Sequence, residues 1–237
     1  MQEIDLALSL AFGLVAAGDP ELLAVVGLSL RVSLTAALAA FCIGVPLAVA
    51  LTAARRLPGR PVFLVLTNAA LGLPPVVVGL VVYLLLSRSG PLGGLGWLFT
   101  PAAMVLAQAM LATPVVVALA HRVLAPLWAE YEDPLRVDGA RPGQVLWQLA
   151  AMGRAPLVTV FLAAFGRCIA EVGAIIIVGG NIRGHTRTMT TAIALETSKG
   201  DLPLALALGL VLVSLSILVS ATAMVLDRRI PQGWPAR

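Results

Sequence analysis

Five apolar runs fill most of this chain, and each is about as long as a helix that crosses a bilayer. A crossing takes about 20 predominantly apolar residues in helical form. The runs cover residues 21–53, 61–87, 101–122, 155–180 and 202–226. Of the 237 residues, 59% are hydrophobic and 12% are charged, whereas soluble domains have roughly 25% charged residues. The sequence therefore predicts an all-α, polytopic helical membrane protein with about five transmembrane helices, and it excludes a water-soluble core.

The first 20 residues differ from these runs. Residues 3–17 are apolar, but they give only about 22 Å of helix at 1.5 Å per residue, which is too short for a full crossing. We expect residues 1–20 to form an N-terminal interfacial segment, with an additional span as the alternative. The transmembrane domain is then expected over residues 21–229, and a short C-terminal tail over residues 230–237.

The basic residues predict how the chain is oriented, because Lys and Arg next to spans gather on the cytoplasmic side. One set of loops and ends holds Arg55, Arg56, Arg60, Arg122, Arg136, Arg141, Arg154, Arg228, Arg229 and Arg237, and the other holds Arg88, Arg183, Arg187 and Lys199. This asymmetry predicts a multi-pass protein of the plasma (inner) membrane with its N-terminus outside and its C-terminus in the cytoplasm. Since the net charge of +4 comes from such loops, nucleic acid is not expected as a partner.

The fourth run carries two charges within an apolar stretch. Arg167 and Glu171 stand one helical turn apart, and Gly173 follows them. A charge at the centre of a membrane helix costs roughly 2.5–3.5 kcal/mol, so both side chains are expected to face protein or a water-filled route. Two interpretations stay open: a structural ion pair at a subunit interface, or residues that line or gate a pathway for a polar solute.

Two adjacent prolines interrupt the second run. Pro74 and Pro75 remove helical hydrogen bonds and are expected to break or kink the span, shortly before Gly79. In lipid, such a break is tolerated where protein or a cavity covers the freed carbonyl groups. The broken span is expected either to act as an apolar gate or to be a static kink that only shapes packing.

The longest polar stretch, residues 123–154, is predicted to be a cytoplasmic loop. Its candidate residues for binding a partner are Glu132, Asp133, Arg136, Asp138, Gly139, Ala140 and Leu149. Residues 138–142 are typical of a turn, with room for a short helix on each side. Such an element along the membrane face is suited to the groove of a cytoplasmic partner, and the alternative is a solvated connector.

The spacing within this loop resembles that of the permease subunits of ABC importers. Glu132 and Asp133 precede Gly139 by seven and six positions, and Leu149 follows it by ten. In that family the loop forms a coupling helix that docks on the ATPase. Here Asp133-Pro134-Leu135 replaces the family's Glu-Ala-Ala, and Ala151 and Met152 replace its Leu and Pro. Residues 28–34, 44–48, 73–79 and 87–93 look like the family's first two core spans.

A later stretch resembles the molybdate/tungstate branch of these permeases. It contains Phe165-x-Arg167-x-x-x-Glu171-x-Gly173 and then Gly180-Asn181-Ile182-x-Gly184-x-Thr186-x-Thr188. Residues 179–182 and 191–197 lean towards the tungstate members. The resemblance implies a subunit that imports an oxyanion, with tungstate favoured and molybdate or sulfate as alternatives. It also implies three partners: cytoplasmic ABC ATPase subunits, an extracytoplasmic oxyanion-binding protein and a second copy of the chain.

Four residues near the outer face are candidates for docking that binding protein or for steering the anion. They are Asn181, Arg183, Arg187 and Lys199. The alternative for the three cations is a solvated loop, and the alternative for Asn181 is to cap the outer end of the fourth span.

Several kinds of chemistry are missing from the sequence. It has no phosphate loop of the form Gly-x-x-x-x-Gly-Lys-Ser/Thr, so we expect a partner subunit to bind and hydrolyse ATP and this chain to hold no cofactor. It also lacks the metalloprotease and nucleophile-elbow motifs, and its two histidines, His121 and His185, are expected near opposite faces. Neither an enzyme nor a metal centre is therefore expected. A stand-alone secondary transporter or channel is the alternative class, although no repeated halves support it.

Overall fold

The described part of the chain is built from helices. The computed structural model describes residues 2–53 and 59–229, and the side chains of residues 2–8, 136 and 227–229 lie outside that description. The helices are α1 (Gln2–Ala17), α2 (Pro20–Ala53), α3 (Arg60–Ala70), α4 (Pro75–Leu86), the 3-10 turn η1 (Gly93–Leu95), α5 (Pro101–Val137), α6 (Pro142–Met152), α7 (Arg154–Ile169), α8 (Gly173–Gly179), α9 (Met189–Lys199) and α10 (Leu202–Arg229). Because these residues contain no strand, the prediction of an all-α protein is confirmed.

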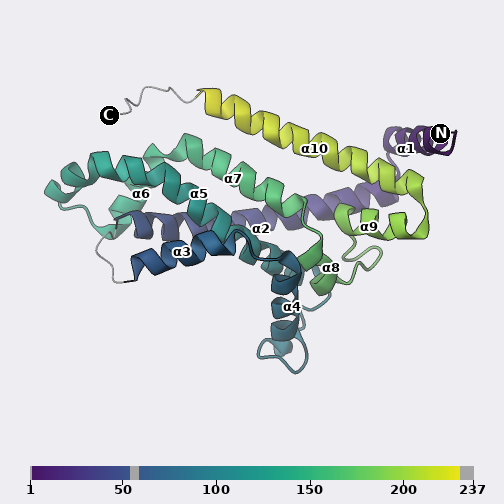
Figure 1. Ribbon diagram of the computed structural model, residues 1–237, viewed down its shortest axis with the longest axis horizontal. Coiled ribbons are helices and arrows are strands. Elements are labelled where there is room, and N and C mark those ends of the chain that lie inside the picture. The colour runs from purple at the N-terminus through teal and green to yellow at the C-terminus, as the bar shows by residue number, and fades with distance from the viewer. Residues whose placement is uncertain (1, 54–58, 230–237) are drawn as a thin grey trace.

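The long helices run side by side along one direction (Figure 1). α2 packs against α5 and α7, and α10 packs against α1, α7 and α9. The shorter α4 stands across this direction with α8 beside it. α2 begins where α1 and α9 lie, and α6 lies at the opposite end. We call these two ends the α9 end and the α6 end. They are about 50 Å apart, because α2 has 34 residues at 1.5 Å each.

Three helices are long and apolar enough to cross a membrane: α2, α5 over Pro101–Leu135 and α10 over Leu202–Leu226. Two bent pairs pass the same test together, namely α3 with α4 at 104° and α6 with α7 at 82°. The described residues thus hold up to five candidate spans, the predicted number, although the fourth one joins α7 with α6 and not with α8. The break between α3 and α4 falls at Pro74 and Pro75, as predicted.

Two helix boundaries differ from those expected. The third run was predicted to end at residue 122, but α5 continues to Val137, because Leu124 and Trp128 are buried in the core and keep the helix packed on the bundle. The predicted loop 123–154 is therefore largely helical. The fourth run was treated as one span over residues 155–180, whereas α7 ends at Ile169 and α8 begins at Gly173.

The contact between α2 and α5 depends on small side chains. Ala36, Ala40 and Ala48 of α2 are buried in the same cluster as Ala112 and Val116 of α5. In lipid the association of helices comes largely from close van der Waals packing, which small residues permit. Gly44 marks the closest approach, since a Cβ added there would lie 2.7 Å from Cγ1 of Val116.

The N-terminal helix α1 is shorter than the candidate spans and packs against α10. Gly18, with a φ of +64°, turns the chain after α1. Asp19 then caps α2, because its Oδ1 accepts hydrogen bonds from the N–H groups of Glu21 and Leu22 at 3.0 and 2.9 Å. The interfacial position of residues 1–20 stays a prediction.

Gly44→Ala is expected to destabilise the protein by about 1–3 kcal/mol, the usual cost of overpacking a core. Gly27→Ala on the same helix is the matched control, because a Cβ added at Gly27 meets nothing within 4 Å. Thermal unfolding in detergent, followed by size-exclusion chromatography, compares the two variants. Equal melting temperatures would contradict the close approach of α2 to α5 at this glycine.

Candidate functional site

The fourth run is interrupted at residues 170–172, between α7 and α8. Glu171 lies in this break and is buried. Its Oε1 accepts hydrogen bonds from the N–H groups of Val172 and Ala174 at 3.1 and 3.3 Å. The carboxylate therefore satisfies backbone donors that have no intrahelical partner at the start of a helix.

Side chains from two other helices donate hydrogen bonds to the backbone at this break. Gln108 of α5 donates from Nε2 to the carbonyl oxygen of Cys168 at 2.8 Å. Thr190 of α9 donates from Oγ1 to the carbonyl oxygen of Glu171 at 2.7 Å. Because hydrocarbon offers no hydrogen-bond partners, backbone groups freed by a break inside a membrane need partners from the protein. The α7–α8 break is thus a junction to which α5 and α9 also contribute.

Arg167 lies on the last turn of α7, with Nη2 3.8 Å from Oε2 of Glu171. The two residues do not share one helix face, since Glu171 lies beyond the end of α7. The side chain of Arg167 is 44% exposed, whereas Glu171 is buried. A half-exposed arginine within a membrane helix requires water or a protein partner. The interface and pathway interpretations of this pair both stay predictions.

The helices α4 and α8 approach each other closely at two glycines. A Cβ added to Gly79 would lie 2.8 Å from the Cα of Ala174, and one added to Gly173 would lie 2.9 Å from Cγ2 of Val76. Pro74 caps α4 and Pro75 is its first residue, directly before Val76. The gate candidates predicted in two separate runs are therefore brought together, with residues 74–79 next to residues 171–174.

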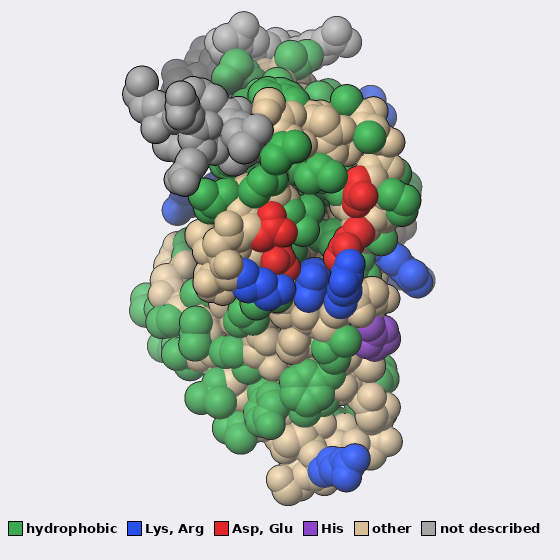
Figure 2. Space-filling view, turned by 90° about the vertical axis from the view of Figure 1, so that its right-hand side faces the viewer, with side chains coloured by type: hydrophobic (Ala, Val, Ile, Leu, Met, Phe, Trp, Pro, Cys, Tyr) green, Lys and Arg blue, Asp and Glu red, His purple; other side chains and the backbone are tan. Residues whose placement is uncertain are grey.

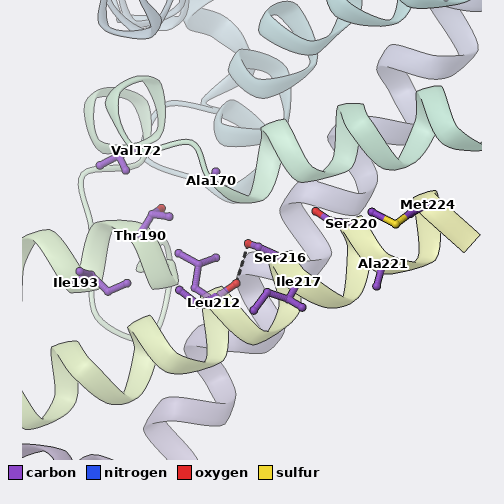
Figure 3. Close-up of a pocket in the computed structure, with 11 residues that line it drawn as sticks. Ala170, Val172, Thr190, Ile193, Leu212, Ser216, Ile217, Ser220, Ala221 and Met224 are labelled. Carbon is purple, nitrogen blue, oxygen red and sulfur yellow. Dashed lines mark hydrogen bonds between the residues drawn. The ribbon is translucent and has the colours of Figure 1, made fainter.

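A cavity of about 700 Å³ lies beside this junction, between α10 and the segments that carry Ala170, Val172 and Thr190 (Figure 3). Its other lining residues are mainly apolar side chains of α10. The Oγ of Ser216 donates to the carbonyl oxygen of Leu212 at 2.8 Å, so this hydroxyl is satisfied within its own helix. None of the described lining residues is charged.

Charged side chains gather at the α9 end, which faces the viewer in Figure 2. Arg183 pairs with Glu21 of the first turn of α2. Nη1 of Arg187 lies 3.4 Å from Oε1 of Glu196 and 3.7 Å from Oε1 of Glu21. Lys199 lies 3.1 Å from the same Glu196 oxygen. The hydrogen bond that Arg183 donates to Glu21 raises the pKa of the Arg183 guanidinium above its ordinary value. The three predicted outer cations are thus joined by two glutamates.

The side chain of Asn181 links the loop that carries these cations to α9. Gly180, with a φ of +71°, ends α8, so Asn181 is not the capping residue. Nδ2 of Asn181 donates to the carbonyl oxygen of Thr191 at 3.2 Å, and its Oδ1 accepts from Oγ1 of Thr191 at 2.9 Å. The side chain therefore holds the loop against the first turn of α9.

The predicted coupling segment forms the α6 end. A turn at residues 138–141 joins α5 to α6. Gly139 in this turn has a φ of +65°, which residues with a Cβ rarely adopt. The N–H of Ala140 donates to the carbonyl oxygen of Leu135 at 3.0 Å and closes the turn. The predicted helix after the turn is confirmed as α6, and the predicted helix before it is the last part of α5.

The helix α6 has a buried face and an exposed face. Leu149 is buried in the core, whereas Trp147 is 75% exposed and Val137, just before the turn, is 86% exposed. Asp138 and Trp147 line one hollow of about 510 Å³. Among the other predicted residues, the exposed ones are Asp133 and Gly139, the partly buried ones are Glu132 and Ala140, and the side chain of Arg136 lies outside the described residues.

Comparison with known proteins identifies the kind of molecule to which these sites belong. Residues 24–232 match the family described as binding-protein-dependent transport system inner membrane component. The chain belongs to this family of permeases. The tungstate uptake system permease protein TupB of Peptoclostridium acidaminophilum is 38% identical over 195 residues, which cover 82% of this chain and 85% of that protein.

Two further relatives cover most of the permease. A probable anion ABC transporter permease protein of Haloferax volcanii is 39% identical over 76% of this chain and 80% of its own. The molybdenum transport system permease protein ModB of Mycobacterium tuberculosis is 35% identical over 71% of this chain and 67% of its own. The protein is thus a multi-pass permease subunit of the inner membrane, as the sequence predicted.

Five residues of these sites were not singled out from the sequence: Glu21, Gln108, Trp147, Thr190 and Glu196. A polar side chain inside an apolar run, as at Gln108, is a signal that the sequence does carry. A carboxylate at the start of a span, as at Glu21, is another. The sequence around Trp147 shows no distinct apolar stripe. Only the structure therefore shows which face of α6 is exposed.

Glu171→Ala is expected to lower the stability of the permease by about 1–3 kcal/mol or more, because it leaves buried N–H groups of the α8 start without an acceptor. Glu171→Gln keeps an acceptor oxygen and loses only the charge opposite Arg167, so a smaller loss is expected. Thermal unfolding in lipid nanodiscs ranks the two variants. An equal loss from both would contradict the capping role.

Proposed function

We propose that this permease is the transmembrane subunit of an ATP-driven importer whose substrate is tungstate. The similarity of most of the chain to a permease named for tungstate uptake is the observation that carries the proposal. Molybdate and sulfate are the alternatives, because permeases named for molybdenum and sulfate transport are 35% and 30% identical. All three ions are tetrahedral dianions, so they are too polar to cross hydrocarbon without such a protein.

Cytoplasmic ABC ATPase subunits are the proposed partners at the α6 end. The exposed Trp147 and Val137 give this end an apolar surface beside the acidic Asp133 and Asp138, and aromatic side chains are frequent anchors in protein interfaces. We place this end in the cytoplasm on the basis of the basic residues near it. ATP is then bound by the partner, and this chain is proposed to hold no cofactor and to catalyse no reaction.

An extracytoplasmic oxyanion-binding protein is the proposed partner at the α9 end, where Arg183 and Lys199 are exposed. A second copy of the chain is the proposed partner within the membrane. Support comes from the half-exposed Arg167, whose charge requires cover from protein or water. Large parts of α10, among them Val213 and Ile217, are also exposed and would face lipid or that second copy.

The gate is proposed to lie where residues 74–79 meet residues 171–174. Gly79 lies close to Ala174 and Gly173 close to Val76, so α4 and α8 are proposed to move as a pair. Arg167 beside them carries a positive charge, and Glu171 offsets part of it. A route with modest attraction suits transport, because tight binding of the dianion would prevent its release.

Reconstitution tests the proposed function directly. The permease, its ATPase and its binding protein in proteoliposomes are expected to take up tungstate only when ATP is present, with tungsten counted by mass spectrometry. Unlabelled molybdate and sulfate serve as competitors and rank the alternatives. Uptake by the permease alone would favour a stand-alone transporter, and no uptake of any of the three oxyanions by the intact assembly would contradict the proposal.

Gly139→Ala is expected to weaken binding of the ATPase by roughly five- to thirtyfold, because a left-handed backbone costs a residue with a Cβ about 1–2 kcal/mol. Steric clash is not the cause, since a Cβ added at Gly139 meets nothing within 4 Å. Gly143→Ala on α6 is the matched control, with equally open space and no positive φ. Affinity measurements between the detergent-solubilised permease and the ATPase compare them, and equal affinities would remove the turn from the docking surface.

A further inference from the structure

A second cavity, of about 400 Å³, lies at the α9 end between the first turns of α2 and the loop that follows α8. Its polar wall consists of Glu21, Arg183, His185 and Arg187. The cavity beside α10 has no charged lining residue among those described, so the two hollows differ in what they can hold. The cavity at the α9 end is the one suited to an ion.

Positive charge exceeds negative charge in the wall of this cavity. Among its described lining residues, Arg183 and Arg187 are basic and Glu21 is acidic. Asp19 lies close by in sequence, but it caps α2 through its own carboxylate and lines a different cavity. The first turn of α2 adds the positive end of a long helix dipole. The cavity wall therefore attracts anions.

Glu21 is the one carboxylate in the described cavity wall, and it makes one exposed ion pair and one long contact. Its partner Arg183 stays 72% exposed while paired, and exposed ion pairs are weakened by water and salt. Its second contact, with Nη1 of Arg187, is 3.7 Å long, beyond a normal hydrogen bond. Arg187 is held independently by Glu196, so Glu21 can leave without releasing Arg187.

We propose that this cavity is a capture site for a tetrahedral oxyanion, which binds Arg183 and Arg187 in place of the Glu21 carboxylate. A tetrahedral dianion has four acceptor oxygens and twice the charge of a carboxylate, and planar guanidinium groups bind such oxygens in pairs. That the anion is tungstate rests on the proposed function. That an anion of this shape and charge binds here rests on the cavity alone.

The displaced carboxylate also explains how the anion leaves. Glu21 stays tethered to the first turn of α2, a few ångströms from both arginines, and competes continuously for them. A site with such a built-in competitor concentrates the dianion at the α9 end without holding it for long, which is what transport requires. The cavity is thus a place of transfer between the outer face and the membrane.

Equilibrium dialysis of the full chain in phosphatidylcholine nanodiscs, with sodium tungstate at low ionic strength, tests the proposal. Tungsten counted by mass spectrometry is expected to show saturable binding of about one tungstate per chain. Glu21→Gln should strengthen binding by about 1.5- to fivefold, the range that removal of one exposed ion pair corresponds to. Arg183→Gln should weaken it by a similar factor or more. Arg88→Gln is the matched control, because it removes the same charge from an exposed loop outside the cavity.

The direction in which Glu21→Gln changes the affinity for tungstate separates a capture site from a purely structural ion network. Weaker or unchanged binding in this variant, at unchanged melting temperature, would overturn the proposal, as would an equal loss from Arg88→Gln and Arg183→Gln. If Glu21→Gln unfolds, tungstate should still raise the melting temperature of the wild type and not that of Arg183→Gln. Uptake by the reconstituted assembly without binding to the wild-type permease would refute the capture site alone. Binding without uptake would refute the proposed function alone.

Discussion

The absence of water in the hydrocarbon core is the constraint on which the rest of this structure depends. Every backbone N–H and C=O group at membrane depth needs a partner within the protein, and the apolar fourth run has a helix break between Ile169 and Gly173. The break persists because Gln108, Glu171 and Thr190 supply the missing donors and acceptors. Polar side chains inside the apolar runs are therefore explained first by the backbone that they satisfy.

The same junction ties the α9 end to the interior of the bundle. Thr190, which donates a hydrogen bond to the carbonyl oxygen of Glu171 in the break, lies on the first turn of α9. Glu196 on the same helix pairs with Arg187 of the charged cluster. Ser29 of α2 accepts a hydrogen bond from the N–H of Met189 at 2.7 Å, so the start of α9 is also fixed to α2. A change at the charged cluster therefore acts on the break through one short helix.

Much of the fold could be predicted from the sequence, because apolar length and proline act locally. The runs gave the number of spans, and Pro74 with Pro75 gave the position of one break. The second break could not be predicted, since no proline marks it and the partners that stabilise it are distant: Gln108 lies 60 positions from Cys168. Arg183 and Glu21 are 162 positions apart, so the sequence indicated outer cations without the carboxylate that joins them.

The helix α7 connects the α6 end to the break that carries Glu171. Only Gly153 separates it from α6, and it ends at Ile169, directly before the break. A Cβ added to Gly153 would lie 3.0 Å from Cδ2 of Leu124 and 3.2 Å from the carbonyl oxygen of Leu149, so the bend between α6 and α7 is closely packed. Because closely packed helices shift as rigid bodies and deform little, a displacement of α6 by the proposed ATPase partner would be passed on to α7. The displacement would then reach the break between α7 and α8, where side chains hold the backbone in place of a continuous helix.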